Sequence, residues 1–193
     1  MLQQTQVSRV VPLYHRFLRT FPSLQHVAGT SARRVTEAWE GLGYYARARN
    51  LHRLAREVMR EPGGELPSDP AELCRLPGIG AYTAGAVASF AYERRAPLVD
   101  TNVARVLRRV FAPALKPGSV AASRTLWAIA ADILPRTGAA TWTHNQALME
   151  LGALVCTARV RHCARCPVRT LCATHARQGC QEPAPTRSRA VTT

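Results

Sequence analysis

Hydrophobic residues recur with a helical period along most of the chain. The segments 31–39, 50–59 and 102–111 each place their apolar residues on one helical face. In the second of these segments the apolar stripe consists of Leu51, Leu54, Ala55 and Val58. No stretch alternates apolar and polar residues over the length of a strand, so the pattern predicts an all-α protein.

Proline and glycine separate the helical segments. The separating stretches are 61–70, 76–80, 96–99 and 115–119. Within the first stretch, Asp69, Pro70 and Glu72 follow the pattern of a capping residue, a first-turn proline and a reach-back acid, which predicts a helix start. From about Ala173 the chain turns polar and loses its periodicity, which predicts a flexible tail over 174–193.

The first residues, MLQQTQVSRVV, raise a separate expectation. Leu2, Val7, Val10 and Val11 lie close to one helical face, and neither a capping residue nor an entry turn precedes them. The pattern therefore predicts a helix that is already under way at Met1.

The charge of the chain indicates its class of partner. Among 193 residues, 26 are Lys or Arg and 12 are Asp or Glu, a formal net charge of +14. Such a field attracts anionic polymers, nucleic acid above all, although a solvated basic surface or a contact with ribosome or membrane is the alternative. No apolar run approaches a membrane span and no secretory signal is present, so we expect a cytoplasmic protein without a membrane partner.

Four of the six cysteines occur within 17 residues, with six, two and five residues between them. They are Cys156, Cys163, Cys166 and Cys172. A reducing cytoplasm disfavours disulfides, so the set predicts a metal site. Zinc sites usually contain two close pairs of cysteines and this segment has one, so the spacing favours an iron–sulfur cluster over zinc. Outside the set, Cys74 is predicted to be a buried core thiol.

Basic residues stand between these cysteines. They are Arg159, Arg161, His162, Arg165 and Arg169. A rigid basic loop is suited to binding phosphate, while charges that only solvate a short loop are the alternative.

The segment LPGIGAYTAGAV joins a helix predicted to end near Leu76 to one that begins near Ala81. Gly78 and Gly80 allow positive φ and leave amide groups uncovered, and the second helix directs its positive end at the same place. The segment therefore predicts a site for one phosphate, and an ordinary glycine turn between helices is the alternative.

Asp100 follows the extended stretch APLV and immediately precedes a predicted helix. One interpretation is a helix cap, because Asp is a preferred residue at that position. The other is functional, because a carboxylate held at a helix N-terminus stays ionised and is able to stabilise positive charge or act as a base. The two interpretations are compatible.

Six stretches in order give the chain a family resemblance. They are MLQQTQV, GLGYYARARNL, LPGIGAYTAGAV, VDTNVARVL, LMELGALVC and the four-cysteine loop. From Met1 to about Cys172 the chain resembles the helix-hairpin-helix DNA glycosylases, and within them the MutY-type adenine DNA glycosylases. The resemblance implies an all-α, two-lobed fold. A partial six-helix barrel with an incomplete first helix would occupy 1–95, the hairpin about 71–91, and an iron–sulfur cluster lobe 96–173.

The resemblance also implies base excision repair. The enzyme would flip adenine mispaired with 8-oxoguanine or guanine out of double-stranded DNA and hydrolyse its N-glycosidic bond. In that reaction Asp100 would stabilise the oxocarbenium-like sugar, Asn102 would lie beside it, and Tyr82 would pack near the sugar and the base. The other implied sites are Gln4 and Tyr44 as wedges in the duplex, with Leu2 and Gln3 beside them, Gly78 and Gly80 on a phosphate, and Cys156, Cys163, Cys166 and Cys172 on a [4Fe-4S] cluster. The protein would act as a monomer.

The residue at position 82 distinguishes branches of this superfamily. The endonuclease III branch has a lysine there, which forms a Schiff base, so Tyr82 implies a monofunctional glycosylase that leaves an abasic site. The basic residues agree, because all except Lys116 are arginines, which do not act as amine nucleophiles. Thymine-mismatch glycosylases of the same superfamily are the alternative activity. A non-catalytic module that binds mismatched DNA is a second alternative, and a zinc protein that binds RNA is a third.

The chain departs from the family pattern at several places. Thr101 stands where the family usually has Gly, and Ala104 where it often has Lys. MutY-like enzymes carry a general-acid glutamate in the turn before MLQQTQV, which would fall upstream of Met1, and the first acid in this chain is Glu37. Larger members add a C-terminal domain that reads 8-oxoguanine. We therefore expect that the 193-residue form is truncated at its N-terminus, lacks the reading domain and has severely reduced activity.

Overall fold

The computed structural model describes residues 1–179, and residues 180–193, which include Cys180 and most of the predicted tail, lie outside this range. Every regular element in the described range is a helix, apart from one isolated backbone bridge between Cys156 and Arg161. The chain divides into two compact units, Met1–Ala84 and Gly85–Thr193. The predicted all-α class is confirmed, and none of the described helices is long and apolar enough to span a membrane.

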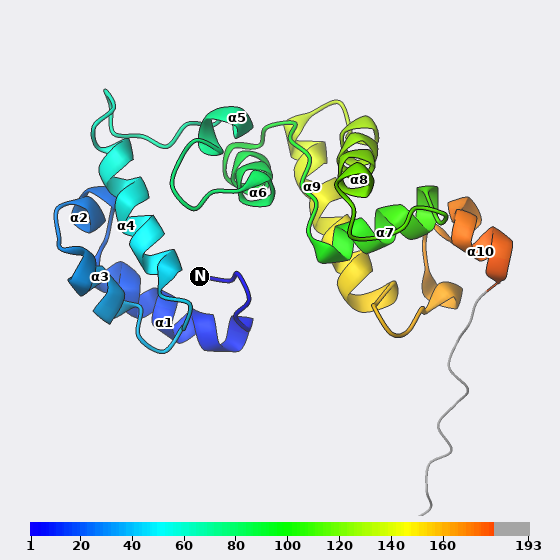
Figure 1. The fold of residues 1–193 in the computed structure, drawn as a ribbon, viewed down its shortest axis with the longest axis horizontal. Coiled ribbons are helices and arrows are strands. Elements are labelled where there is room, and N and C mark those ends of the chain that lie inside the picture. Colours follow the sequence, from blue (N-terminus) through cyan, green and yellow to red (C-terminus); the bar gives the residue numbers. More distant parts are fainter. Residues whose placement is uncertain (180–193) are drawn as a thin grey trace, which may run out of the picture. The chain divides into compact units, whose positions relative to one another are not determined.

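In the first unit, α4 packs against two neighbouring helices. The elements of this unit are α1 (Val7–Thr20), α2 (Leu24–Ala28), α3 (Ala32–Ala38), α4 (Ala46–Val58), α5 (Pro70–Leu73) and the first turn of α6 (Ala81–Tyr92). Helix α4 contacts α2 and α3 (Figure 1), and it buries Leu54, Ala55 and Val58 of the predicted stripe. Phe17 of α1 meets Trp39 edge to face, with ring centroids 5.8 Å apart.

Side-chain caps define several helix starts in this unit. Ser31 accepts a hydrogen bond from the amide of Arg34 at the start of α3. Asp69 Oδ1 accepts from the amides of residues 71 and 72, at 2.8 and 3.1 Å, and Pro70 is the first residue of α5. The predicted cap at Asp69 is therefore confirmed.

The prediction of a helix already under way at Met1 is wrong. Helix α1 begins at Val7, after a turn in which the amide of Thr5 donates to the Leu2 carbonyl at 3.3 Å. Gln4 has φ 55°, which a right-handed helix does not accommodate. Of the apolar residues that suggested one helical face, only Val10 is buried.

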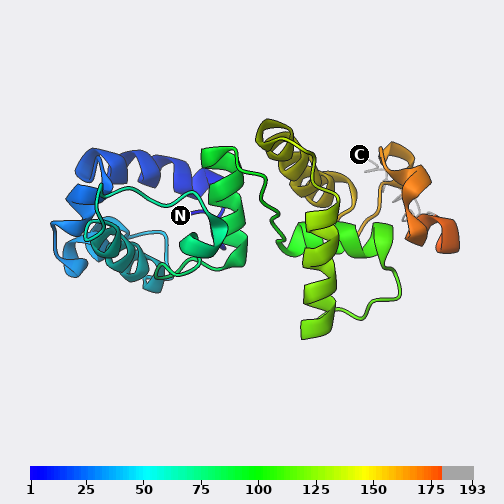
Figure 2. The same cartoon turned by 90° about the horizontal axis from the view of Figure 1, so that it is seen from above.

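The second unit is built around α7 (Thr101–Phe111). The other elements are the remainder of α6 after Ala84, α8 (Val120–Asp132), α9 (Gly138–Glu150), the π-helical turn η1 (Leu151–Val155), the 3₁₀ turns η2 (Cys163–Arg165) and η3 (Arg169–Leu171), and α10 (Ala173–Gln178). Helix α7 contacts α8, α9, η1 and α10 and buries Val103, Val106 and Leu107. Figure 2 shows α10, in orange, beside the C-terminal end of α7.

Two expectations about individual residues fail. Residues 173–178 form α10 instead of beginning a flexible tail, because Thr174 is buried and its hydroxyl donates to the Arg109 carbonyl at 2.6 Å. Cys74 is exposed and not a core thiol, because it directly follows the short helix α5, in which Leu73 takes the buried position.

Candidate functional site

The glycine turn between α5 and α6 leaves its backbone accessible. Gly78 and Gly80 are both exposed, and Gly78 has φ 79°. The Gly80 carbonyl accepts from the amide of Ala84 at 2.9 Å, so α6 begins immediately after the turn. Exposed amides at the positive end of a helix are suited to binding a phosphate group.

The turn also packs closely on α4. A Cβ atom at Gly78 would lie 2.6 Å from the Cβ of Asn50, whereas one at Gly80 would meet nothing within 4 Å. Gly80 therefore has space for a side chain and Gly78 does not, although both residues are exposed.

This difference gives a stability prediction. Gly78→Ala adds both a left-handed conformation at a non-glycine residue and the contact with Asn50, so we expect the free energy of unfolding to fall by about 1–3 kcal/mol. Gly80→Ala is the matched control and should cost less, because the space around it is open. Urea unfolding of both variants measures the difference, and equal losses would contradict the packing argument.

The N-terminal segment lies beside the turn. Gln3 Nε2 donates to Thr83 Oγ1 of α6 at 3.0 Å. Gln4 and Tyr44, the two residues expected to enter the duplex, are exposed and both have positive φ, at 55° and 48°. Such a conformation costs a non-glycine residue about 1–2 kcal/mol. Leu2 is also exposed.

Arg47 joins the N-terminal segment to the turn before α4, and the sequence did not single it out. Nη1 donates to the carbonyls of Met1 and Gln3, and Nη2 donates to Thr5 Oγ1 at 3.0 Å and to the carbonyls of residues 42 and 43 at 3.1 and 3.2 Å. Its guanidinium carbon lies 5.6 Å from the Trp39 ring centroid and 5.4 Å from that of Tyr44. Desolvation lowers the pKa of Arg47, while the nearby Tyr44 opposes the change.

In the second unit, Asp100 caps α7 as predicted. Its Oδ1 accepts from the amide of Val103 at 2.7 Å, and its Oδ2 accepts from Asn102 Nδ2 at 3.2 Å. The side chain is partly buried. Both carboxylate oxygens thus accept hydrogen bonds from the same helix, and these bonds fix the orientation of the carboxylate group.

A chain of hydrogen bonds continues from Asn102 to the cysteine segment. Arg105 Nη2 donates to Asn102 Oδ1 at 2.7 Å and to the Gly152 carbonyl at 2.6 Å, and Arg105 Nε donates to the Cys156 carbonyl at 2.9 Å. A Cβ atom at Gly152 would lie 2.8 Å from the Cβ of Asn102, so glycine is needed for this approach. Asp100 and the first cysteine are therefore joined through Asn102 and Arg105.

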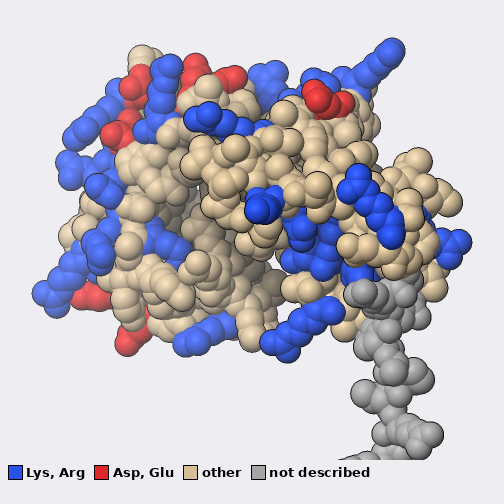
Figure 3. Space-filling view, turned by 45° about the vertical axis from the view of Figure 1, so that its right-hand side comes forward, with Lys and Arg blue, Asp and Glu red and all other residues tan. Residues whose placement is uncertain are grey.

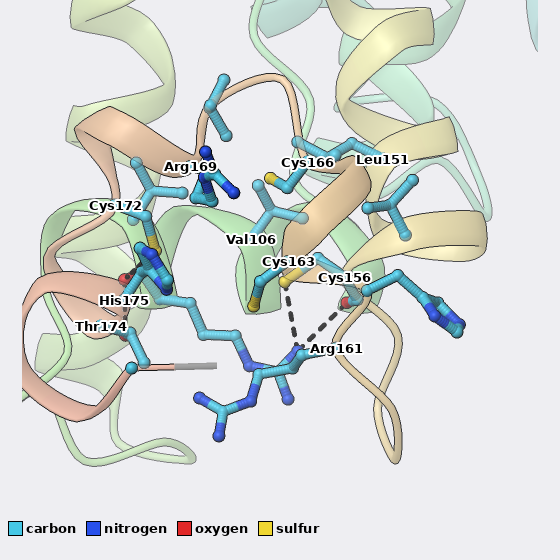
Figure 4. A pocket seen from close by; sticks show the side chains of 16 residues that line it. Val106, Leu151, Cys156, Arg161, Cys163, Cys166, Arg169, Cys172, Thr174 and His175 are labelled. Carbon is cyan, nitrogen blue, oxygen red and sulfur yellow. Dashed lines mark hydrogen bonds between the residues drawn. The ribbon is translucent and has the colours of Figure 1, made fainter. Parts of the chain in front are cut away.

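The four clustered cysteines line one pocket (Figure 4). Cys156, Cys163, Cys166 and Cys172 direct their side chains towards it. Its apolar lining includes Val106, Val110, Leu151, Val155 and Val168. Burial raises the pKa of the Cys166 thiol. Within residues 1–179, no three His, Cys, Asp or Glu side chains converge closely enough to hold a single metal ion.

Arg109 contacts both ends of the cysteine segment. Its Nη1 lies 3.2 Å from Cys156 Sγ and donates to the Thr157 carbonyl at 2.7 Å. The Arg109 carbonyl accepts from Thr174 Oγ1 at 2.6 Å and lies 3.5 Å from Cys172 Sγ. Like Arg47 and Arg105, this residue was not identified from the sequence.

The basic residues of the cysteine segment divide into two groups. Arg159 and Arg165 are exposed, while Arg161 and His162 are partly buried and line the pocket together with the exposed Arg169. The wider surface is also basic, and Figure 3 shows Lys and Arg side chains outnumbering acidic ones on the visible face. The loop therefore offers exposed charge while some of its basic groups face the cysteines.

Residues 1–131 match the family model described as HhH-GPD superfamily base excision DNA repair protein. The chain belongs to this superfamily, and the predicted helix-hairpin-helix fold is confirmed. A solved structure of a thermostable thymine-DNA glycosylase is 28% identical with a TM-score of 0.81, covering 91% of this chain and 80% of that one. A trapped endonuclease III–DNA covalent intermediate is 26% identical with a TM-score of 0.73, covering 91% of this chain and 80% of that one.

Within the superfamily, the curated relatives indicate a particular branch. The chain is 46% identical to the adenine DNA glycosylase of Rattus norvegicus over 93% of its length, and 46% identical to that of Homo sapiens over 89%. It is also 46% identical over 87% of its length to the adenine DNA glycosylase of Mycolicibacterium smegmatis, of which it covers 56%. The chain spans about a third of the length of the two mammalian relatives, 34% and 31%.

Proposed function

We propose that this protein is a monofunctional adenine DNA glycosylase of base excision repair. Its substrate is double-stranded DNA that carries adenine opposite 8-oxoguanine or guanine, and it hydrolyses the N-glycosidic bond of the adenine. The observation that carries the proposal is Asp100, held through both oxygens at the start of α7 in a chain 46% identical to adenine DNA glycosylases. We further propose that the protein acts as a monomer on DNA in the cytoplasm or nucleoid.

Asp100 supplies the electrostatic part of the reaction. As the bond from the sugar to adenine breaks, positive charge develops on the deoxyribose, and a carboxylate fixed beforehand stabilises that charge without reorganising. Asn102 positions Oδ2 through its 3.2 Å hydrogen bond. Tyr82, in the first turn of α6, packs near the sugar and the flipped base. A tyrosine forms no Schiff base, so the product is an abasic site in an intact strand.

The first unit supplies the residues that bind the duplex. Gly78 and Gly80 bind one phosphate with the exposed amides of their turn. Gln4 and Tyr44 enter the base stack, and Leu2 and Gln3 contact the DNA beside them. The exposure of these side chains supports the role.

The cysteine pocket fits an iron–sulfur cluster better than zinc. All four cysteines line one pocket, and their segment contains one close pair of cysteines, whereas zinc sites usually contain two. We propose that Cys156, Cys163, Cys166 and Cys172 hold a [4Fe-4S] cluster. When bound, the cluster cross-links the loop and fixes its exposed arginines for contact with phosphates.

The proposed activity is tested with duplexes that contain adenine opposite 8-oxoguanine. The full-length natural protein is incubated with the duplex, and abasic sites are detected by strand cleavage after alkali treatment. We expect cleavage only after alkali, and no protein–DNA adduct after borohydride reduction. Absence of base release from any mismatch would overturn the proposal.

Two other results would each favour an alternative function. Release of thymine from a guanine mismatch without release of adenine would favour the thymine-mismatch activity, in keeping with the thymine-DNA glycosylase structure of similar fold. Mismatch affinity without release of any base would indicate a binding module.

Metal analysis that finds zinc without iron or sulfide would overturn the cluster assignment.

A further inference from the structure

Two strained residues occupy exposed positions in the first unit. In residues 1–179, the non-glycine residues with positive φ are Gln4, Tyr44 and Glu93. Gln4 is exposed, and Tyr44 has 62% of its surface accessible, so packing of their own side chains does not offset the strain. Strain of this kind persists where the surroundings impose it, and it is concentrated at functional sites.

The surroundings of both residues include one guanidinium group. Arg47 donates to the Gln3 carbonyl and the Thr5 hydroxyl, on either side of Gln4. It also donates to the carbonyls of residues 42 and 43, immediately before Tyr44, and stacks near the Tyr44 ring. Gln4 is therefore flanked on both sides, and Tyr44 on its N-terminal side, by residues that are hydrogen-bonded to this one side chain.

Arg47 forms its hydrogen bonds within the protein and connects two segments of the first unit. Both terminal nitrogens point at protein acceptors, and the side chain is partly buried between the N-terminal segment and the 42–44 turn. A planar fork with fixed donors makes several such bonds at once, which the single ammonium group of lysine does not. The terminal donors of Arg47 are thus already bonded to protein acceptors before DNA binds.

We propose that Arg47 is a positioning residue that holds Gln4 and Tyr44 in their left-handed conformations before DNA binds. This inference rests on the proposed function, in which these two side chains enter the duplex. Because the segment is already ordered, less conformational entropy is lost on binding, and mismatch affinity rises without any bond from Arg47 to DNA.

The first test uses the free protein. In Arg47→Lys, we expect amide hydrogen exchange over residues 3–7 and 43–46 to accelerate by about tenfold or more, while exchange in the core of α4 is unchanged. Thr5→Val is a milder variant that removes one acceptor and leaves Arg47 in place, so it should accelerate exchange near Gln4 alone. Arg56→Lys, at an exposed position on the same helix, is the control. Unchanged exchange in Arg47→Lys would overturn the proposal.

The second test uses DNA and separates positioning from phosphate binding. We expect Arg47→Lys to weaken affinity for an adenine mismatch by about 10–100-fold while affinity for matched duplex and the slope of log affinity against log salt stay unchanged. A uniform loss on both duplexes, with a salt slope reduced by about one, would show that Arg47 contacts phosphate and would overturn the proposal. Mismatch affinity that is unchanged in Arg47→Lys would also overturn the proposal.

The experiments distinguish a failure of the proposed function from a failure of the role proposed for Arg47. If the parent protein does not prefer mismatched over matched duplex, the proposed function fails, yet the exchange experiment still decides whether Arg47 orders the segment. If the parent prefers mismatches and Arg47→Lys retains both the preference and the protection, only the role of Arg47 is wrong.

Discussion

Replacing Asp100 with asparagine is expected to reduce the rate of adenine release by about 10³-fold or more. The change removes the negative charge that stabilises the positive sugar in the transition state, an interaction whose loss typically costs two to three orders of magnitude or more. Asparagine is also a good helix cap, and its oxygen is able to accept the bond from the amide of Val103, so α7 should form normally. Single-turnover base release measures the effect.

The control for this variant is Asp69→Asn. Asp69 is also a capping aspartate, at the start of α5, so the substitution makes the same chemical change at another helix start. We expect Asp69→Asn to release adenine at the parental rate and Asp100→Asn to retain mismatch affinity within about threefold. Parental release by Asp100→Asn would contradict its assigned role and favour a different charge-stabilising group.

The second large effect is expected at Arg105. Arg105→Met keeps an unbranched side chain in place of the aliphatic part of arginine but removes the donors to Asn102, Gly152 and Cys156, leaving three partly buried acceptors without this partner. Loss of a charged partner costs about 1.5–3 kcal/mol per hydrogen bond, and Asn102 loses the group that orients it toward Asp100. We expect base release to fall by about 10–100-fold and the protein to bind less iron, as measured by kinetics and metal analysis.

Arg108→Met is the matched control for Arg105→Met. Arg108 lies three residues further along α7 and is partly buried, and the bonds from α7 to Gly152 and Cys156 come from Arg105 and Arg109. The control should keep both iron and activity. If both variants lose activity equally, the effect comes from helix α7 as a whole and not from the bonds to Asn102 and Cys156.

The features that the sequence predicted correctly depend on local spacing. Helices α4 and α7 follow from the periodic apolar residues that they bury, and the caps at Asp69 and Asp100 follow from residues only two or three positions apart. The two wrong element boundaries depend on contacts between distant residues. Helix α10 is held by the bond from Thr174 to Arg109, and the left-handed Gln4 is adjacent to residues bonded to Arg47.

The same distinction applies to the candidate site. The cysteines and glycines stood out because their type and spacing are unusual, and the structure places the four cysteines around one pocket. Arg47, Arg105 and Arg109 did not stand out, because all but one of the 26 basic residues are arginines. Which of these arginines makes internal bonds is determined by tertiary packing, which no local pattern records.

The contacts of Arg109 bear on how the cysteine segment would hold the proposed cluster. The side chain of this residue reaches Cys156 and its carbonyl receives the Thr174 hydroxyl, so both ends of the segment are attached to the same turn of α7. Closing a loop costs conformational entropy, and the hydrogen bonds of Arg109 to Cys156 and Thr174 offset part of this cost. The proposed cluster would therefore have to order only the residues between the two attachment points, and without it the two ends of the segment would stay attached to α7.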